Sequence, residues 1–285
     1  MSMGRVRLAP GRAGLAAVAL TLLPFPHALA FQGRTVSIAK PGDDRRIFVL
    51  DRELKVPYPG ALSFVYVGHA RAAPDQRVAV KLSRYPKTTY AKEHEILTQV
   101  NDPRLPRSFG VGVVEGEDAT QALVLGLAAG GQLGKSYGQW APRAPGKAVR
   151  IAMQLARAMR SMEDAGWRHN DLHPANIHIE NERSRTVAVL DVGGATRASE
   201  GSIRISPYYS PAKEAIGPPE INADVYAVAA ILLHMITGTA NRDLIDQLPP
   251  GVMDVVAKAL HPDPLQRYRK PQELINALRP FQADR

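Results

Sequence analysis

Hydrophobic and polar residues alternate along the first third of the chain. Residues 64–70 and 77–82 alternate in this way and are rich in β-branched side chains, with the polar run Ala-Pro-Asp-Gln between them. This pattern predicts an antiparallel hairpin. Two more strands are expected at 111–114 and 122–127, together with a helix over 88–100 that begins at a threonine cap. The first third is therefore expected to be a mainly antiparallel sheet with one helix.

The second half of the chain has helical spacing instead. Residues 147–165 repeat apolar positions at helical intervals, and residues 223–237 are apolar nearly all round, which predicts a helix buried on every side. Further helical turns are expected at 252–260 and 271–279. Two short apolar runs, IHI and VAVL, lie between the two long helices at the spacing of a β-hairpin. The whole pattern predicts an α+β fold.

Composition narrows the chemistry. The chain has 285 residues, of which 45% are hydrophobic and none is cysteine, so it can form a full core but holds no disulfide, thiolate zinc site or cysteine nucleophile. The net charge is +9, but it is too diffuse to indicate a nucleic-acid partner, and none is expected.

Residues 1–30 differ from the rest. An arginine-bearing start is followed by the apolar residues 13–23 and by small residues at Ala28 and Ala30, the layout of a secretory signal peptide. A membrane anchor, with residues 13–30 associated with a bilayer, is one alternative, and a start codon placed too early is another. Export or anchoring predicts a location outside the cytoplasm. Residues 31–44 are expected to be a linker.

The residues most typical of catalysis lie between 169 and 193. The run HNDLHPAN at 169–176 is followed, after the expected short hairpin, by Asp-Val-Gly at 191–193. These runs resemble the HxDxxxxN and DxG motifs of the protein-kinase-like superfamily, and the chain is most similar to a bacterial eukaryotic-type Ser/Thr protein kinase. Upstream, Val-Ala-Val-Lys at 78–81 resembles the family's strand motif, whose lysine binds the α- and β-phosphates of the nucleotide.

In the family this lysine, here Lys81, pairs with a glutamate on the next helix, and the sequence offers Glu93 and Glu95. Glu93 lies at helical spacing from three apolar residues, Ile96, Leu97 and Val100. It therefore falls on the inward face of the helix, whereas Glu95 points away. A buried carboxylate needs a cation, so Glu93 is expected to pair with Lys81, and Glu95 to be a solvated surface charge.

The resemblance implies a bilobal protein-kinase-like fold over about residues 45–280. The small antiparallel-sheet lobe with its one helix is expected at about 45–126, and the larger, mainly helical lobe at about 131–280. The implied reaction transfers the γ-phosphate of ATP to a hydroxyl group with the help of Mg²⁺ or Mn²⁺.

The resemblance also assigns roles to individual residues. Asp171 would orient the acceptor hydroxyl, and Asn176 and Asp191 would bind the metal. His173 replaces the family's catalytic-loop lysine and would donate to the γ-phosphate, more strongly when protonated. The catalytic set is thus Lys81, Glu93, Asp171 and His173, and nucleotide contacts are expected at Gly60, Ser63, Val65, Ala79, Lys81, Leu125 and Leu127.

Besides His173, three further features depart from the family pattern. Only Gly60 remains of the glycine-rich loop that covers the phosphates. Asn170 stands where regulated kinases carry the arginine that clamps a phosphorylated activation segment, so activity is not expected to need that phosphorylation. Arg267 resembles the arginine of a late structural motif whose glutamate partner is replaced by Ala212, with Glu214 as a substitute.

A serine or threonine of a protein is the preferred acceptor. The segments at 206–211 and 222–227 resemble an activation-segment end and the start of a buried helix whose aspartate, here Asp224, holds the catalytic loop in protein kinases. Several small-molecule and lipopolysaccharide-sugar kinases also carry a histidine at the position of His173, so one alternative acceptor is a small molecule or a lipopolysaccharide sugar. The reduced loop at Gly60 and the export-like start favour another, a pseudokinase that acts as a binding module. ATP chemistry itself favours the cytoplasm.

Overall fold

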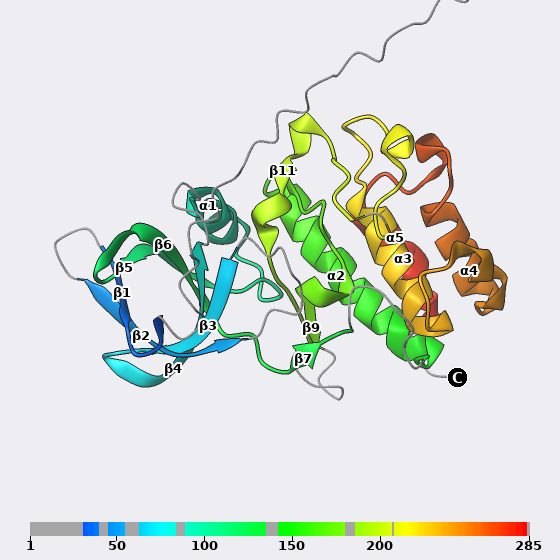
Figure 1. The fold of residues 1–285 in the computed structure, drawn as a ribbon. Coiled ribbons are helices and arrows are strands. Elements are labelled where there is room, and N and C mark those ends of the chain that lie inside the picture. Colours follow the sequence, from blue (N-terminus) through cyan, green and yellow to red (C-terminus); the bar gives the residue numbers. More distant parts are fainter. Residues whose placement is uncertain are drawn as a thin grey trace, which may run out of the picture.

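The computed structural model describes residues 31–39, 45–54, 63–83, 89–134, 142–179, 186–206 and 208–283, without the side chains of 117–119. Residues 1–30 and Gly60 lie outside this range, so the expectations for them stay predictions. The described chain forms two lobes (Figure 1), a small lobe of strands with one helix (31–126) and a larger, mainly helical lobe (131–283). This is the α+β architecture expected from the sequence.

The strands of the small lobe close into an antiparallel barrel in the order β1-β2-β3-β4-β6-β5. They are β1 (Thr35–Ile38), β2 (Arg46–Leu54), β3 (Ser63–Ala70), β4 (Ala73–Ser83), β5 (Ser108–Val114) and β6 (Glu117–Gly126). Closure depends on β1, which pairs with both β2 and β5 and buries Val36 and Ile38 in the barrel core. The expected linker over 31–44 is therefore wrong for residues 31–39, which complete the barrel.

The expected hairpin is formed by β3 and β4, but its turn is at Arg71 and Ala72. Residues 73–76, expected to link the strands, belong to β4. Ala70 pairs with Ala73 and His69 with Arg77, so residues 74–76 bulge out of the ladder. Proline has no N–H to donate to a ladder, and strands commonly place it at such a bulge. Pro74 therefore shifts the turn and leaves an exposed bulge on the small lobe.

The helix α1 (Ala91–Val100) connects the lobes. Its buried residues Ile96 and Leu97 belong to the same core cluster as α2, not to the barrel core. The helix begins at Ala91 rather than at residue 88, and the hydroxyl of Thr89 accepts a hydrogen bond from the N–H of Ala91 at 3.2 Å. It ends where expected, at Asn101, whose left-handed conformation (φ 42°) is a common helix stop.

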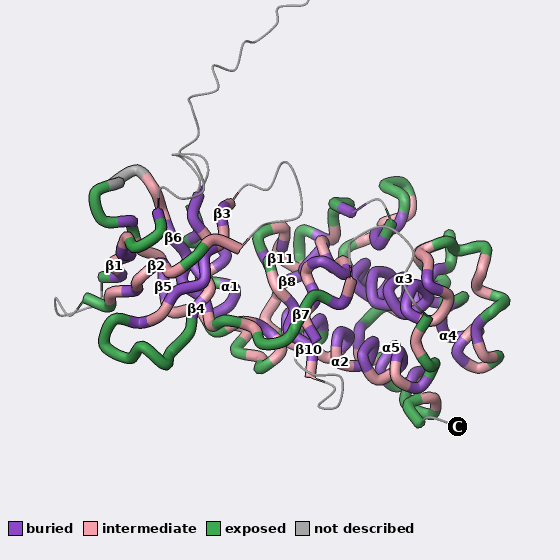
Figure 2. The backbone as a smooth tube through the Cα atoms, turned by 60° about the horizontal axis from the view of Figure 1, so that its bottom comes forward, coloured by how far each residue is buried: buried purple, intermediate pink, exposed green. Residues whose placement is uncertain are grey.

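The large lobe is built around α3 (Asp224–Thr237). Every residue from Asp224 to Met235 is buried, and Figure 2 shows the helix buried along its length. The helix α2 (Pro145–Asp164) packs against both α3 and α5 (Pro271–Leu278), while α4 (Pro250–Ala259) packs against α3 and α5. The sequence therefore predicted the central helix correctly from its lack of a polar face.

Short elements position the loops of the large lobe. A three-stranded sheet contains β7 (Gly131–Gln132), β9 (Ile177–Ile179) and β10 (Val187–Val189), of which β9 and β10 form the expected hairpin. A second pair joins β8 (Trp167–Arg168) to β11 (Thr196–Arg197). Seven 3₁₀ helices are described in this lobe: η2 (Pro174–Asn176), η3 (Val192–Gly194), η4 (Ala198–Glu200), η5 (Lys213–Ala215), η6 (Arg242–Gln247), η7 (Pro264–Gln266) and η8 (Arg279–Phe281).

Helices long and apolar enough to cross a bilayer are not found among the described residues.

The packing of β1 gives a stability prediction. Val36 on β1 is fully buried, whereas Val113 on the neighbouring β5 is 40% exposed. We expect Val36→Ala to lower the free energy of unfolding by about 2 kcal/mol, because two buried methyl groups lose their contacts. Val113→Ala is the matched control and should lower it by less than about 0.5 kcal/mol. Urea denaturation measures both, and equal small losses would show that β1 is not packed in the barrel.

Candidate active site

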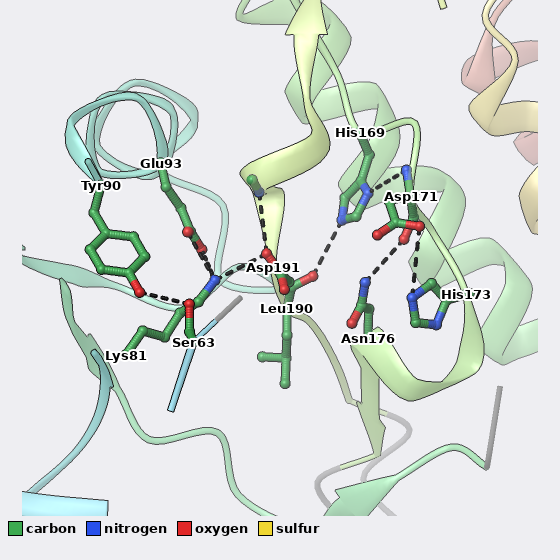
Figure 3. Close-up of polar contacts among 11 residues, drawn as sticks. Ser63, Lys81, Tyr90, Glu93, His169, Asp171, His173, Asn176, Leu190 and Asp191 are labelled. Atoms are coloured by element: carbon green, nitrogen blue, oxygen red, sulfur yellow. Dashed lines mark hydrogen bonds and ion pairs between the residues drawn. The ribbon is translucent and has the colours of Figure 1, made fainter. Parts of the chain in front are cut away.

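One lysine joins three elements of the two lobes (Figure 3). The Nζ atom of Lys81 on β4 lies 2.9 Å from both carboxylate oxygens of Glu93 on α1 and 3.0 Å from Oδ1 of Asp191 in the large lobe. The side chain of Lys81 is 12% exposed and that of Glu93 is 5% exposed. Burial alone lowers the pKa of Lys81, but Asp191 and Glu93 outweigh it and raise the pKa above its ordinary value. The structure thus places Lys81 and Glu93 together as a buried charged pair.

Glu95 lies on the exposed side of α1 as expected, with 44% of its side chain exposed, but it also has partners. Its Oε1 accepts hydrogen bonds from Arg197 on β11 at 2.7 Å and from Gln99 at 3.0 Å. The guanidinium of Arg197 lies 3.7 Å from the ring centroid of Trp167, whose Nε1 donates to Gln99 at 2.9 Å. This network, Glu95, Gln99, Trp167 and Arg197, holds the outer side of α1 to the large lobe while Lys81 holds its inner side.

The strand register explains why several expected nucleotide contacts lie together. Val65 is directly opposite Lys81, and Leu125 is directly opposite Ala79. Residues opposite each other share a sheet face, as do residues two apart on one strand. Ala79 and Leu125 pack with the core cluster of the large lobe, so this face is turned toward that lobe. Leu127 follows β6 and is 38% exposed.

Ser63 lies close to Lys81 but is engaged with another side chain. Its hydroxyl is 2.6 Å from the hydroxyl of Tyr90, the residue that precedes α1, and Figure 3 shows this pair beside Lys81. The Nζ of Lys81 lies 5.9 Å from the centroid of the Tyr90 ring. Tyr90 was not predicted as part of the site. It fixes Ser63 against the start of α1 and covers one side of the ammonium group.

The catalytic-loop backbone is held by Asp224 at the start of α3. Its Oδ2 accepts from the N–H of His169 and its Oδ1 from the N–H of Asn170, both at 2.8 Å. Asp224 is only 2% exposed, and charge-assisted hydrogen bonds of this kind are strong away from water. Asn170 has φ 64°, a left-handed conformation that asparagine adopts more readily than most residues. The aspartate therefore fixes an otherwise unfavourable turn.

His169 links this loop to the segment that carries Asp191. It is fully buried, which lowers its pKa. Its Nδ1 is 3.2 Å from the N–H of Asp171 and its Nε2 is 3.3 Å from the carbonyl oxygen of Leu190. Nδ1 must accept and Nε2 must donate, which requires the neutral imidazole with its proton on Nε2. The HxDxxxxN motif begins at His169, but the sequence does not show that this histidine is neutral or that it joins the catalytic loop to Leu190.

Asn170 connects the loop to the chain that follows Asp191. Its side-chain amide donates to Thr196 at 2.9 Å and to the carbonyl of Gly194 at 3.3 Å, and its Oδ1 accepts from the N–H of Ile203 at 3.2 Å. The sequence predicted only that no cation stands at this position. The structure adds that a neutral side chain orders this segment through hydrogen bonds that need no phosphate.

Asp171 and His173 have opposite pKa shifts. Burial, and after it the charge of Asp191, raises the pKa of Asp171 to about 7. Burial, and after it His169, lowers the pKa of His173 to about 4. The Nε2 of His173 lies 3.7 Å from Asp171, beyond hydrogen-bond distance. His173 is therefore neutral at neutral pH and donates one N–H at most, so the protonated form expected to donate more strongly is not the resting form.

The two predicted metal ligands supply oxygen donors. The Nδ2 of Asn176 donates to the carbonyl of Asp171 at 3.1 Å, which leaves its amide oxygen for another partner. Burial raises the pKa of Asp191, but Lys81 and the N–H of Gly193 hold it below its ordinary value. Amide and carboxylate oxygens suit Mg²⁺ or Mn²⁺. Groups of three or more His, Cys, Asp or Glu side chains that could hold a metal ion are not found in the described ranges.

Arg267 does not use the expected substitute partner. It donates to the carbonyl oxygens of Ala215, His261 and Pro262 at 2.7, 2.6 and 3.0 Å. Glu214 is exposed on η5, and within the described chain no ion pair joins it to Arg267. The arginine is 5% exposed and fixes this corner through backbone carbonyls and through the ring of Tyr226, whose centroid lies 5.1 Å from its guanidinium carbon.

The sequence of the chain is similar to those of known proteins. Residues 59–248 match the family model described as "Protein kinase domain". The chain is 25% identical over 251 residues to a probable serine/threonine-protein kinase PknB of Lactococcus lactis, covering 76% of this chain and 39% of that protein. It is 23% identical over 260 residues to a probable serine/threonine-protein kinase of Clostridium perfringens, covering 79% of this chain and 37% of that protein. The chain thus spans less than half the length of these curated relatives.

The network around Glu95 predicts the mobility of α1. We expect Arg197→Ala to speed backbone hydrogen exchange in residues 91–100 by about three- to tenfold, because an ion pair and a stacking contact are lost, together about 1 kcal/mol. Arg160→Ala removes an exposed pair within α2, with Asp164 at 3.3 Å, and should leave α1 unchanged. Equal exchange in α1 for the parent and Arg197→Ala would show that the network does not hold this helix.

The raised pKa of Asp171 predicts a pH-dependent stability. The folded protein keeps this proton up to about pH 7, whereas the ordinary pKa is 3.8. Its contribution to stability is therefore present at acid pH and lost as the pH rises between these values. Since asparagine has no such proton, Asp171→Asn should stabilise the protein more at pH 8 than at pH 5, by about 2–3 kcal/mol. Urea unfolding in EDTA measures this, and the same difference at both pH values would contradict the assignment.

Proposed function

Because the chain belongs to the protein kinase domain family, we propose that it is an ATP-dependent Ser/Thr protein kinase. The observation that carries the proposal is the contact of Lys81 with both Glu93 and Asp191. This contact would bring a phosphate-binding ammonium group beside Asp191, one of the two proposed metal ligands (Figure 3). The similarity to proteins named as probable serine/threonine-protein kinases favours the same acceptor class.

ATP would bind between the sheet face of the small lobe and the large lobe. Val65, Ala79 and Leu125 offer an apolar surface on that face, which suits a flat base. Lys81 would then bind the α- and β-phosphates, with Glu93 fixing the direction of its side chain. Ser63 is placed beside Lys81 by Tyr90 and would lie at the phosphate end of the nucleotide.

The metal site would be formed by Asn176 and Asp191. A bound Mg²⁺ or Mn²⁺ ion supplies positive charge next to the transferred phosphate. The bond from Asn176 to the Asp171 carbonyl fixes the amide so that its oxygen serves this purpose. Lys81 and the N–H of Gly193 both donate to Oδ1 of Asp191, which fixes the carboxylate and would leave its Oδ2 for the metal.

Transfer would depend on Asp171 in its carboxylate form. The acceptor hydroxyl donates its proton to Asp171 while its oxygen forms a bond to the γ-phosphorus, and the bond from phosphorus to the β-phosphate oxygen breaks to release ADP. Neutral His173 would donate a hydrogen bond to the γ-phosphate. Because Asn170 already orders the segment from Gly194 to Ile203, this chemistry would not require phosphorylation of that segment.

A small-molecule hydroxyl is the second candidate acceptor, favoured by His173 at the catalytic-loop position. Its reaction would use the same residues with a different acceptor, so only the labelled product separates the two.

Phosphate transfer tests the proposal. The purified chain with Mg²⁺ and γ-³²P-labelled ATP should label serine or threonine of casein. Asp171→Asn should slow the transfer by about 10²- to 10⁴-fold, because the proton acceptor is lost, while nucleotide binding persists. The surface variant Asp164→Asn is the control and should keep full activity. Label on a small hydroxyl compound alone would favour the second candidate, and full turnover by Asp171→Asn would refute the catalytic assignment.

A further inference from the structure

A separate cavity lies on the small lobe at the end of the barrel beyond Ala79 and Lys81. Its volume is about 530 Å³, and it is lined by the start of β2, the turn between β3 and β4, the bulged start of β4 and the residue before β5. None of the predicted site residues lines it. A volume of this size is within the range of ligand-binding sites, so the cavity has room for one or two side chains of a partner.

The floor of this cavity is aromatic. The rings of Phe48 and Phe109 lie 5.9 Å apart at 46°. Phe48 is buried in the barrel core and Phe109 packs against the same core from the rim. Phe48 is only 1% exposed, so Phe109, which is half-buried, offers most of the aromatic surface that a ligand could contact, and its packing against the core holds it in place.

The rim of the cavity is made of arginine. Arg45, Arg46, Arg71 and Arg107 line it, all are exposed, and no acid shares the lining. The guanidinium of Arg107 lies 5.2 Å from the centroid of Phe109. Within the part of the chain that the structure describes, none of these four side chains forms an ion pair.

Some arginines elsewhere on the described chain form ion pairs. Arg77 binds Asp51, Arg104 binds Asp102 and Arg197 binds Glu95, at 2.9, 2.6 and 2.7 Å. The cavity brings four guanidinium groups together, and among the described residues no carboxylate lies within ion-pair distance of any of them.

Among the described residues, two acids lie near this rim without lining it; Asp43 and Asp44, next to Arg45 in the sequence, lie outside the described residues. Glu115 accepts hydrogen bonds from Thr35 and Ser37, and its pKa is lowered, chiefly by the bond from Thr35 and to a smaller extent by Arg71 and Arg45. Asp75 is exposed on the bulge of β4. Both leave the arginines in excess, so the rim keeps a positive charge.

We propose that this cavity binds an acidic peptide segment of a partner protein that carries an aromatic or aliphatic side chain. Guanidinium groups bind carboxylates in pairs of parallel hydrogen bonds, and the phenyl floor would take the apolar side chain. A lipid surface would touch the rim but would not fill a concave floor. A positively charged rim also attracts an acidic partner from a distance and speeds its association.

The place of the cavity suits a docking site that leaves the catalytic residues free. The carbonyl of Arg107 accepts from the N–H of Gly126 at 2.8 Å, where β6 ends and the chain leaves the small lobe. A partner bound here would lie against the outer side of this connection, while Leu125 faces the other lobe. Docking would therefore increase the local concentration of the partner without contact with Asp171.

Peptide binding without nucleotide tests the proposal independently of phosphate transfer. The probe is a fluorescein-labelled peptide of ten residues that alternates Glu and Phe, measured by fluorescence anisotropy. We expect binding that weakens by about tenfold between 50 and 300 mM salt. A peptide with Gly in place of Phe should bind several-fold more weakly, because it leaves the aromatic floor uncovered.

Matched variants locate the binding. The double variant Arg46→Glu with Arg71→Glu should lose at least about tenfold in affinity, because like charges then face the peptide. Arg269→Glu with Arg279→Glu makes the same change in charge on the exposed surface of the large lobe and should bind like the parent. Equal binding by all three proteins would overturn the proposal. So would binding to phosphatidylserine vesicles, abolished by the first variant, in the absence of peptide binding.

Discussion

The ammonium group of Lys81 is the point on which the two lobes depend. It comes from a strand of the barrel, yet its partners are a glutamate of α1 and an aspartate of the large lobe, at 2.9 and 3.0 Å. A buried charge without a partner is strongly unfavourable, so Lys81 and Glu93 depend on each other, while Asp191, whose side chain is 49% exposed, adds the link to the large lobe. The barrel register, the helical phase of α1 and the loop before η3 must therefore all agree. The contact of Lys81 with Glu93 and Asp191 therefore constrains how the two lobes are arranged.

The rest of the site holds the neighbours of Lys81 in position. Asp224 fixes the backbone of the catalytic loop, and neutral His169 connects that loop to Leu190, next to Asp191. The network of Glu95 and Arg197 holds α1 from its other side. All these contacts join groups of the chain itself, so the fold alone fixes the positions of the site residues. Burial, and after it the charge of Asp191, raises the pKa of Asp171, so this arrangement makes the carboxyl group less readily ionised than usual.

Local patterns were enough for much of this fold. The apolar character of α3, the alternation of β3 and β4 and the helical phase that separates Glu93 from Glu95 are all properties of neighbouring residues. β1 was missed because a strand of four residues has too short a pattern, and its role appears only when it pairs with β5 to close the barrel. The turn at Arg71 was misplaced because Pro74 suggested a loop, whereas the ladder accommodates it in a bulge.

The contacts that refine the site join residues far apart in the chain. Arg197 lies 102 residues after Glu95, and no periodicity within one segment records such a pair. The neutral state of His169 likewise follows from two hydrogen-bond partners and full burial, which are properties of the folded protein. The arginine-rimmed cavity combines three separate parts of the small lobe, each of which is unremarkable in sequence.

A crystal structure of the chain with Mg²⁺ and a non-hydrolysable ATP analogue tests the central claim most directly. The account predicts that the phosphates bind at Nζ of Lys81 and that the metal is held by side-chain oxygens of Asn176 and Asp191. A nucleotide whose phosphates lie away from Lys81, or a metal held by other residues, would contradict it.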